Sequence, residues 1–420
     1  MSEKIMGKKK VEETKREEKD QLKLERLQST LNRAFKNVPF HRKRFLEKNL
    51  SPQDIISLSD VDHLPFMNRS HLGTHYPYGL FAVPLRDIVR IHTAPGTGNR
   101  PSISGYTKTD LLIWKKLVAR SLEAAGVTQM DIIQIQLPQG LANWGHDYKD
   151  GGEAMGAGVI PNSFLSLSKN LMVLRDYKTT TLVTTPTFAE QLMDHMFDQE
   201  HNPNELNLKR IILVGEPVDN KTVVTLEDRL HVDIWRNYGL SEIPGPAIAH
   251  ECTGHCGLHI NDDHILPEII DPVSGRALNF GEKGELVLTT LSARAFPLIR
   301  FRTGDMARFV TEPCDCGSSF IKMEWLRERS DNYMIISGIK VSLDQVKIDL
   351  EAALGIFNPH CDMDRMRHSG TEFLQISLVM DDTLFSDEIK NLEKMIFQTE
   401  ETLREQTGVP VDIKLVQRSE

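Results

Sequence analysis

The feature that most constrains the fold is an alternation of short apolar runs with amphipathic segments between residues 91 and 290. Short apolar runs predict buried strands, and amphipathic segments of helical length predict helices that cover them. The predicted strands are Asp131–Gln136, Thr181–Thr185, Arg210–Val214, Asp233–Trp235 and Glu285–Thr289. Because helix-length crossovers separate most of these runs, we expect an α/β fold with a mostly parallel sheet flanked by helices.

One covering helix has a clear beginning and end. It begins near Thr109 and places Trp114, Leu117 and Leu122 on one face, the spacing of an amphipathic helix. Gly126 follows the last apolar position, and glycine commonly ends a helix.

The pattern changes after Asp331. An amphipathic segment at Leu343–Leu354 precedes an alternating run at Phe373–Met380, a long helix from Ile389 to Leu403 and a second alternating run from Val411 to Leu415. These elements predict a compact α+β domain in the normal size range for a small second domain.

The length of 420 residues allows two or three domains. We divide the chain into a charged N-terminal helix or tail (1–30), a large domain (31–329) and a small α+β domain (330–420). The first segment mixes nine basic with seven acidic residues, so we interpret it as a solvated helix or frayed end without a function of its own.

The charge and cysteine content narrow the partners and the compartment. A net charge of −9 argues against broad nucleic-acid binding and favours small-molecule partners. Five cysteines are an odd number, and no leader of basic then apolar residues precedes them, so we expect a reducing cytoplasmic location. No apolar run approaches the roughly 18 residues of a membrane span, so we expect no membrane association.

Three short segments carry chemistry at the ends of apolar runs. His92–Pro101 is a Gly- and Thr-rich loop with one cation, suited to phosphate oxygens but lacking Walker spacing. Tyr238–Glu242 offers an aromatic ring, a hydroxyl and a carboxylate, and Phe301–Asp305 offers a carboxylate of the kind that accepts ribose hydroxyls. The Gly- and Thr-rich loop alone is at least as often a surface turn as a site, and each of the other two segments alone is more often a turn than a site. Their conjunction in this order is what favours a site.

Taken together, the motifs resemble the adenylate-forming enzymes, and within them the phenylacetate–coenzyme A ligase group. The resemblance extends from about residue 25 nearly to the C-terminus. Its motifs are Thr97-Gly98, Gly215-Glu216-Pro217, Tyr238-Gly239-Leu240-Ser241-Glu242, Arg302-Thr303-Gly304-Asp305 and Arg329-Ser330-Asp331, with supporting segments such as Asn37-Val38-Pro39-Phe40 and Pro297-Leu298-Ile299-Arg300.

The resemblance implies an ATP- and Mg²⁺-dependent ligase. A carboxylate, of an aryl or arylacetic acid, attacks the α-phosphate of ATP, the small mobile domain rotates, and coenzyme A displaces AMP from the acyl-adenylate. A homodimer is common in the group.

The resemblance also implies a role for each matching residue. The phosphates would be contacted by Thr97, Gly98 and Arg100, and the α-phosphate by Ser241, while Glu242 would hold Mg²⁺. The adenine pocket would be lined by Gly215, Glu216 and Pro217, with Tyr238 stacked on the base and Gly239 beside it. Asp305 would accept the ribose hydroxyls, Arg329 would lie near ribose or phosphate, and Gly338 would belong to a loop that faces coenzyme A.

Three positions depart from the family pattern. The phosphate loop has Arg100 where the family has lysine, and arginine keeps the charge but changes the donor geometry. Glu328 stands where a glycine usually precedes the Arg-Ser-Asp motif. The family's catalytic lysine comes just after a run like Arg418-Ser419-Glu420, with which the given sequence ends. Lys414 lies within a predicted strand and is a poor substitute for that lysine.

These departures keep two alternatives open. One is a degenerate nucleotide- or acyl-adenylate-binding homologue with impaired adenylation. The other is a chain that only transfers a supplied acyl-adenylate to coenzyme A.

Cysteines and histidines gather in two short segments, Cys252–His259 and Cys314–Gly317. Soft ligands in two clusters are typical of a structural zinc site with four protein ligands. Some members of the resembling group share these elements, which favours Cys252, His259, Cys314 and Cys316, while Cys256 and His255 remain rival ligands.

Overall fold

A computed structural model describes residues 2–94, 102–138, 141–163, 165–243, 245–357, 359–368, 371–379 and 389–416. The chain forms two compact units, each assembled from distant parts of the sequence. The first combines residues 1–96, 100–125 and 237–330, and the second combines residues 97–99, 126–236 and 331–420.

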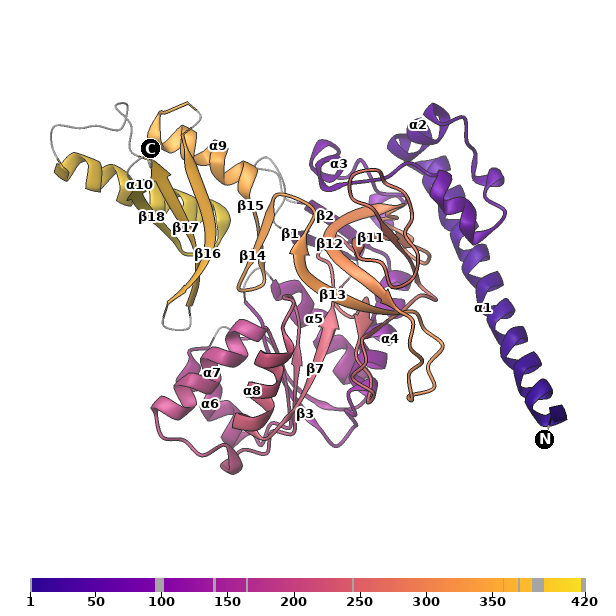
Figure 1. The fold of residues 1–420 in the computed structure, drawn as a ribbon, viewed down its shortest axis with the longest axis horizontal. Coiled ribbons are helices and arrows are strands. Elements are labelled where there is room, and N and C mark those ends of the chain that lie inside the picture. The colour runs from indigo at the N-terminus through magenta and orange to yellow at the C-terminus, as the bar shows by residue number, and fades with distance from the viewer. Residues whose placement is uncertain are drawn as a thin grey trace. The chain divides into compact units, whose positions relative to one another are not determined.

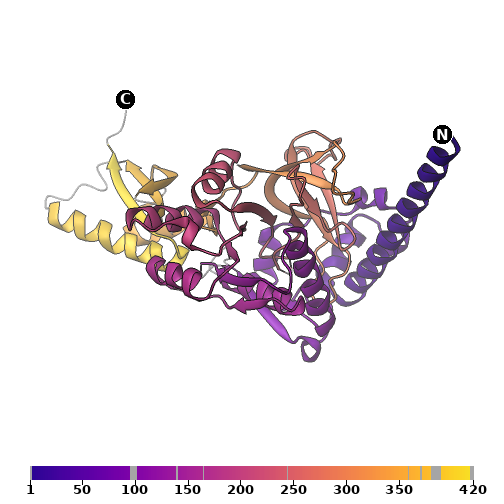
Figure 2. The same cartoon turned by 90° about the horizontal axis from the view of Figure 1, so that it is seen from below.

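The first unit pairs a long N-terminal helix with antiparallel strands. Figures 1 and 2 draw α1 as one uninterrupted helix, in indigo. The helices of this unit are α1 (Ser2–Asn37), α2 (Pro39–Glu47), α3 (Arg69–Thr74) and α4 (Lys108–Ala124), and its strands are β1 (Arg90–Ala94), β2 (Ser102–Tyr106), β8 (Ala249–His250), β9 (Leu258–Ile260), β10 (Ile265–Ile270), β11 (Gly284–Thr290), β12 (Phe301–Val310) and β13 (Lys322–Arg329).

Its strands are hydrogen-bonded in the order β10-β11-β12-β13-β9-β8, and every pair is antiparallel. Leu27, Leu31 and Ala34 lie at helical spacing on α1 and are fully buried in a core shared with Phe45 and Ile299. Hydrophobic burial of this face therefore fixes α1 to its unit.

Helix α4 shows why its sequence begins and ends where it does. The Thr107 hydroxyl accepts a hydrogen bond from the backbone N–H of Asp110, and the Asp110 carboxylate accepts one from the backbone N–H of Thr107. This capping box satisfies N–H groups that the helix itself leaves unpaired. Gly126, at φ +74°, follows the last turn, as the sequence predicts.

The second unit contains the parallel part of the fold. Its strands pair in the order β4-β3-β5-β6-β7, all parallel. They are β3 (Ile132–Gln136), β4 (Gly158–Ile160), β5 (Thr181–Thr184), β6 (Arg210–Leu213) and the first residues of β7 (Asp233–Tyr238), accompanied by α5 (Ala142–Ala154), α6 (Leu167–Asp176), α7 (Pro186–Asp198) and α8 (Asn220–Leu230).

The C-terminal residues form a small α+β subset of the same unit. Their elements are β14 (Tyr333–Ile336), β15 (Ile339–Ser342), α9 (Leu343–Leu354), β16 (Cys361–His368), β17 (Thr371–Val379), α10 (Ile389–Thr407) and β18 (Val411–Val416). Strand β17 pairs with β16 antiparallel and with β18 parallel. A separate hydrophobic core, including Val346, Leu374 and Leu403, holds these elements together.

The predicted strands and the predicted mixed α/β architecture are confirmed. A mostly parallel arrangement describes β3 to β7, whereas the strands of the first unit pair antiparallel. The difference has a simple cause, because ten residues (291–300) separate β11 from β12 and eleven (311–321) separate β12 from β13, too short for helical crossovers.

We predict that Arg300→Gln destabilises the protein by about 3–5 kcal/mol, because it removes one partner of a buried ion pair. The Arg300 guanidinium is 3% exposed, bonds both carboxylate oxygens of Glu268 at 2.8 and 3.2 Å, and donates to the carbonyls of Asp62 and Leu64. Urea unfolding measures the change.

Arg308→Gln is the matched control. Its partner on β13 is Glu324, and both side chains are about half exposed, so its loss changes the free energy of unfolding by at most about 1 kcal/mol. Equal effects of the two substitutions would contradict the assignment of Arg300 as a buried anchor.

Candidate active site and metal centre

A buried carboxylate joins three strands of the first unit. The hydroxyl of Tyr238, at the end of β7, donates to Asp305 Oδ2 at 2.8 Å, and Arg329 Nη1 donates to Asp305 Oδ1. Arg329 Nη2 also donates to the carbonyl of Thr303 at 3.0 Å. Asp305 and Arg329 are register partners of β12 and β13, so strand pairing places them together.

This arrangement fixes the protonation state of Tyr238. Burial, followed by the charge of Asp305, raises the pKa of the Tyr238 hydroxyl well above its usual value. Tyr238 is therefore a neutral hydrogen-bond donor, and its ring contacts Trp325 edge-on at 4.8 Å between centroids. A carboxylate has about four acceptor positions, so it can accept several hydrogen bonds at once.

Glu242 lies against a cation that the sequence motifs do not include. Arg69 Nε, on α3, donates to Glu242 Oε1 at 2.6 Å, and both side chains are buried. The guanidinium allows the carboxylate to remain charged away from water. No spacing rule selects Arg69 among 50 basic residues; only the principle that a buried carboxylate needs a cation predicts that a partner exists.

The predicted loops of the second unit meet through two glycines. Gly215 follows β6 at φ +85°, and Gly338 lies between β14 and β15 at φ +79°. A Cβ built on Gly215 would lie 2.5 Å from Leu141 Cδ1 and 3.8 Å from the Cα of Gly338. A Cβ on Gly338 would lie 2.9 Å from the same Leu141 atom, so neither position accommodates a side chain.

Glu216, beside Gly215, is a buried acid with incomplete hydrogen bonding. Its Oε2 accepts a hydrogen bond from the Thr187 hydroxyl at 2.7 Å, while Oε1 has no hydrogen-bond partner among the residues that the structure describes. Burial, and next the charge of Glu372, raises the pKa of Glu216 to about 8. The carboxyl group is therefore mostly neutral at pH 7.

The remaining predicted residues are distributed unevenly. Pro217 follows Glu216 directly, and Gly239 and Ser241 follow β7 in half-buried positions. Thr97, Gly98 and Arg100 lie outside the described residues. Lys414, the poor substitute for a catalytic lysine, is exposed on β18 opposite Ser377.

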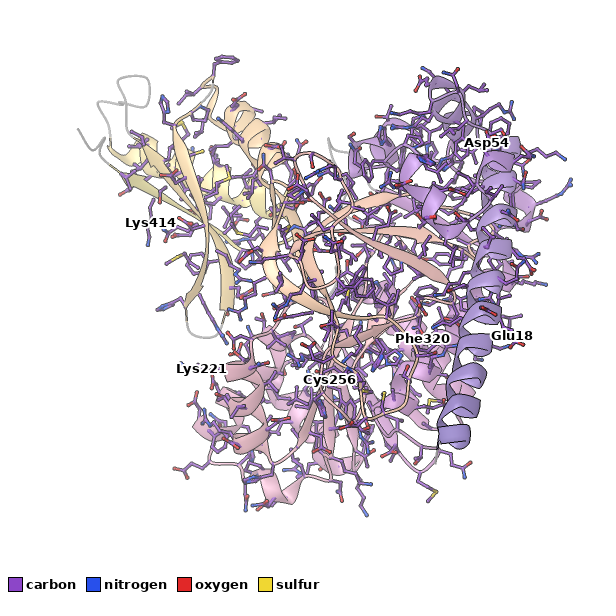
Figure 3. The ribbon with its side chains drawn as sticks, turned by 45° about the vertical axis from the view of Figure 1, so that its right-hand side comes forward. Glu18, Asp54, Lys221, Cys256, Phe320 and Lys414 are labelled. Atoms are coloured by element: carbon purple, nitrogen blue, oxygen red, sulfur yellow. The ribbon has the colours of Figure 1, made fainter. Side chains whose placement is uncertain are left out.

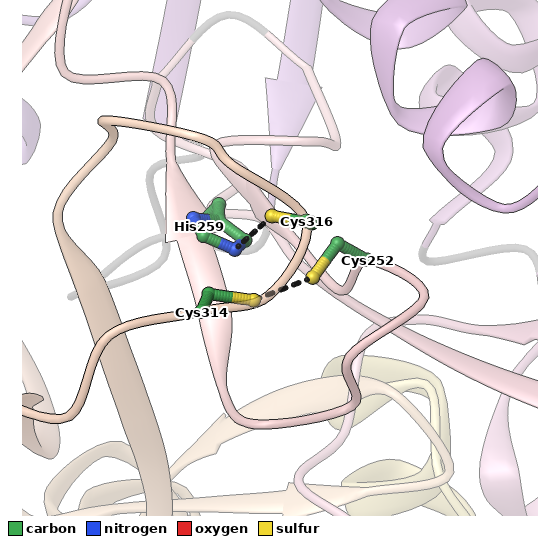
Figure 4. Close-up of side chains that lie close together, drawn as sticks. All are labelled: Cys252, His259, Cys314 and Cys316. Atoms are coloured by element: carbon green, nitrogen blue, oxygen red, sulfur yellow. Dashed lines mark hydrogen bonds between the residues drawn. The ribbon is translucent and has the colours of Figure 1, made fainter.

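Four soft ligands converge in the first unit (Figure 4). One potential ligand atom from each of Cys252, His259, Cys314 and Cys316 lies within 4.8 Å of all the others. Cys252 Sγ is 3.3 Å from Cys314 Sγ, and Cys316 Sγ is 3.4 Å from His259 Nε2. Tetrahedral zinc with bonds near 2.3 Å to sulfur sets ligand atoms about 3.5–3.8 Å apart, so this donor set fits the ion.

The rival ligands have other neighbours. The Sγ atom of Cys256, labelled in Figure 3, lies 3.2 Å from the ammonium of Lys322. The Nδ1 atom of His255 lies 3.6 Å from Glu251 Oε2. The local turn depends on Gly254, since a Cβ there would lie 2.9 Å from Cys314 Sγ.

Comparisons with known proteins agree on one family. Residues 155–292 match the family described as AMP-binding enzyme. The phenylacetate-coenzyme A ligase of Thermus thermophilus is 32% identical over 96% of this chain and 93% of that protein. The enzyme of the same name from Pseudomonas putida is 37% identical over 78% of this chain and 74% of its own length.

A solved structure supports the fold. A 2-hydroxyisobutyryl-CoA ligase, in complex with 2-HIB-AMP and CoA in the thioesterification state, superposes with a TM-score of 0.87 at 21% identity, covering 95% of this chain and 86% of that one. Identity at this level supports the fold alone.

We predict that Glu216→Gln flattens the pH dependence of stability. A pKa of about 8 in the folded state, against about 4.5 when unfolded, means that the native state binds the proton more tightly. The stabilisation is complete below the unfolded pKa and is lost as pH rises through about 8. Between about pH 6 and about pH 8.5 the free energy of unfolding of the wild type should fall by more than about 1.4 kcal/mol relative to that of Glu216→Gln. Urea titrations of both proteins at the two pH values measure this difference.

Glu200→Gln, an exposed position in the same unit, is the control and should follow wild type. Charged neighbours that contribute to the shift are Glu372, Arg365 and Glu190. Parallel pH profiles for wild type and Glu216→Gln would refute a neutral buried Glu216.

Proposed function

The chain belongs to the phenylacetate–coenzyme A ligase family of AMP-binding enzymes and is an AMP-forming acid–coenzyme A ligase; from this premise we propose that its substrate is an aryl or arylacetic acid. The similarity extends over more than nine-tenths of the chain and of a phenylacetate–coenzyme A ligase. This extent favours ligation over a degenerate nucleotide-binding homologue.

The proposed reaction has two balanced steps. A carboxylate oxygen of the acid attacks the α-phosphorus of ATP. The bond between this phosphorus and the oxygen that bridges the α- and β-phosphates breaks, and pyrophosphate leaves. The thiolate of coenzyme A then attacks the acyl carbon, and AMP leaves with the electron pair of the broken C–O bond. Neither step needs a covalent enzyme intermediate, so positioning and charge stabilisation supply the catalysis.

In this proposal the first unit holds ribose and magnesium. Asp305 accepts ribose hydroxyls, supported by the orientation that Tyr238 and Arg329 impose on its carboxylate. Glu242, whose carboxylate is oriented by the hydrogen bond from Arg69, would hold Mg²⁺. Carboxylate oxygens are the ligands that Mg²⁺ prefers, and the ion would offset phosphate charge.

The other proposed contacts follow the family motifs. The adenine site is lined by Gly215, Glu216 and Pro217 together with Tyr238 and Gly239. The phosphates are contacted by Ser241, Thr97, Gly98 and Arg100. Gly338 belongs to the loop that faces coenzyme A. The short approach between the loops of Gly215 and Gly338 supports the last of these proposals.

We predict acid-dependent release of AMP and pyrophosphate from ATP, with formation of an acyl-coenzyme A thioester, when arylacetic and aryl acids are supplied. Asp305→Asn should lower kcat/KM for ATP by at least about tenfold, because the amide changes the acceptor geometry of a group that contacts substrate. Asp233→Asn, exposed on β7, is the control. Thermal melting of both variants separates loss of activity from loss of fold.

Absence of acid-dependent AMP across the panel would overturn adenylation as the activity. In that case preformed acyl-AMP and coenzyme A test the transfer-only alternative directly. Thioester formed from the supplied adenylate would support it.

We also propose that Cys252, His259, Cys314 and Cys316 hold a structural zinc ion. The donor set and its convergence support zinc, and closure by four protein ligands leaves no position for substrate. Burial, above all, raises the pKa of the metal-free Cys252 thiol to about 12, so metal binding would displace a firmly held proton.

Metal analysis is expected to find about one zinc per chain in protein purified without chelators. Cys314→Ser should lose the metal and lower the melting temperature, whereas Cys256→Ser should retain it. Retention of zinc by the first variant, or its loss from the second, would contradict the proposed ligand set.

We further propose a cytoplasmic homodimer. The five cysteines are free thiols, and thiols stay reduced in the cytoplasm. Within the described ranges, no helix has both the length and the apolar character needed to cross a lipid bilayer. The dimer itself follows only from the family resemblance, and sedimentation of the purified chain tests it.

A further inference from the structure

A cavity of about 490 Å³ in the first unit lies apart from every residue assigned to catalysis or metal binding. Helices α1 and α4 form two of its walls, and His264 together with Leu291–Arg294 completes it. Cavities of roughly 300–1,000 Å³ hold small-molecule ligands in many proteins. The size alone is therefore compatible with a ligand of metabolite dimensions.

The lining carries a concentrated positive charge. Its five cationic side chains are Arg26, Arg33, Lys116, Arg120 and Arg294, and its one carboxylate is Glu25. The whole chain has a net charge of −9, so this concentration runs against the overall balance.

Hydrogen bonds anchor three of these cations, and Arg33 is one of them, since its Nη2 donates to the Thr30 hydroxyl at 3.2 Å and to the Ala293 carbonyl at 3.3 Å. Arg120 bonds both carboxylate oxygens of Asp263 at 3.1 Å, and Arg26 donates to the carbonyl of the same residue. Phe320, labelled in Figure 3, lies 5.0 Å from the Arg120 guanidinium, measured to the ring centroid. These contacts hold Arg120 in place on one side of the cavity.

Three of the cations lack an acidic partner. Across the described parts of the chain, Arg33, Lys116 and Arg294 form no ion pair, and Arg33 Nε is buried without a hydrogen-bond acceptor. The neighbouring acid Asp110 instead accepts hydrogen bonds from the backbone N–H groups of Arg294 and Ala295.

The cations also act on each other. Burial first, and then the charge of Arg294, lowers the pKa of Arg33. Burial likewise lowers the pKa of His264 to about 4; Asp263 opposes this shift, whereas Arg26, Arg120 and Lys116 add to it. Cations that line one cavity repel each other, and a bound anion would reduce that repulsion.

We propose that this cavity binds a small molecule carrying several phosphate charges, with Arg33, Lys116 and Arg294 as its main ligands. Guanidinium groups form paired hydrogen bonds with phosphate oxygens, and a lysine adds a compact charge. The lining also contains the hydroxyls of Ser29 on α1, Thr109 on α4 and Ser292, which supply further donors. Inorganic polyphosphate and phosphate esters share this chemistry.

Calorimetry with inorganic tripolyphosphate tests the proposal on the full chain. Wild type should show a binding event that weakens at high salt, and Lys116→Gln with Arg294→Gln should lose at least about tenfold in affinity for it. The matched control is Lys108→Gln with Lys115→Gln, which changes the net charge equally at two positions of α4 outside the cavity lining. Fructose 1,6-bisphosphate forms the second arm, and the tighter probe distinguishes inorganic from esterified phosphate.

Melting temperatures give an independent readout. Without ligand, the Lys116 and Arg294 double variant should have a higher melting temperature than the control double variant, because repulsion among the cations of the cavity is reduced. Tripolyphosphate should raise the melting temperatures of wild type and control only. Ligase activity of both double variants should match wild type. No binding to wild type by either probe, or equal affinity loss in both double variants, would overturn the proposal.

Discussion

The first unit depends on one buried carboxylate, that of Asp305. Removing a carboxylate from water costs several kcal/mol unless an opposite charge and hydrogen bonds compensate. Arg329 supplies the charge and Tyr238 a neutral hydroxyl. Because these three residues come from β12, β13 and the end of β7, the compensation works only when the strands are in their observed register. The constraint that stabilises the sheet therefore also orients the acceptor proposed for ribose.

Much of this could be predicted from sequence, for reasons that particular residues make clear. Tyr238 and Asp305 follow or lie within apolar runs, and apolar patterns record where strands lie. Their proposed roles came from the family resemblance, and the contact between them was not predicted. Arg69 could not be predicted, because its contact with Glu242 joins α3 to a loop 173 positions away and no periodicity connects them. The antiparallel pairing of the strands in the first unit could not be predicted either, since apolar runs indicate burial and not strand direction.

The proposed zinc site also shows which features the sequence records and which depend on backbone geometry. Spacing within Cys252–His259 and Cys314–Gly317 identifies which residue types gather, but it leaves Cys256 and His255 as equal candidates. Backbone geometry separates them. Gly254 allows the chain to turn closely past Cys314, which directs Cys256 toward Lys322 and leaves His259, on β9, facing the other thiols.

Three buried acids show how neighbouring side chains stabilise either the charged or the neutral form of a carboxyl group. Asp305 and Glu242 each contact a guanidinium, which stabilises a carboxylate charge where the proposed site needs oxygen ligands for ribose and magnesium. Glu216 has a hydroxyl partner, Thr187, and a nearby like charge, Glu372, so its proton is retained near neutral pH. A neutral carboxyl adds no repulsion to a loop proposed to face a nucleotide, whereas a charged one there would oppose phosphate binding. The same residue type therefore performs opposite electrostatic tasks, and the difference lies entirely in which side chains the fold places beside it.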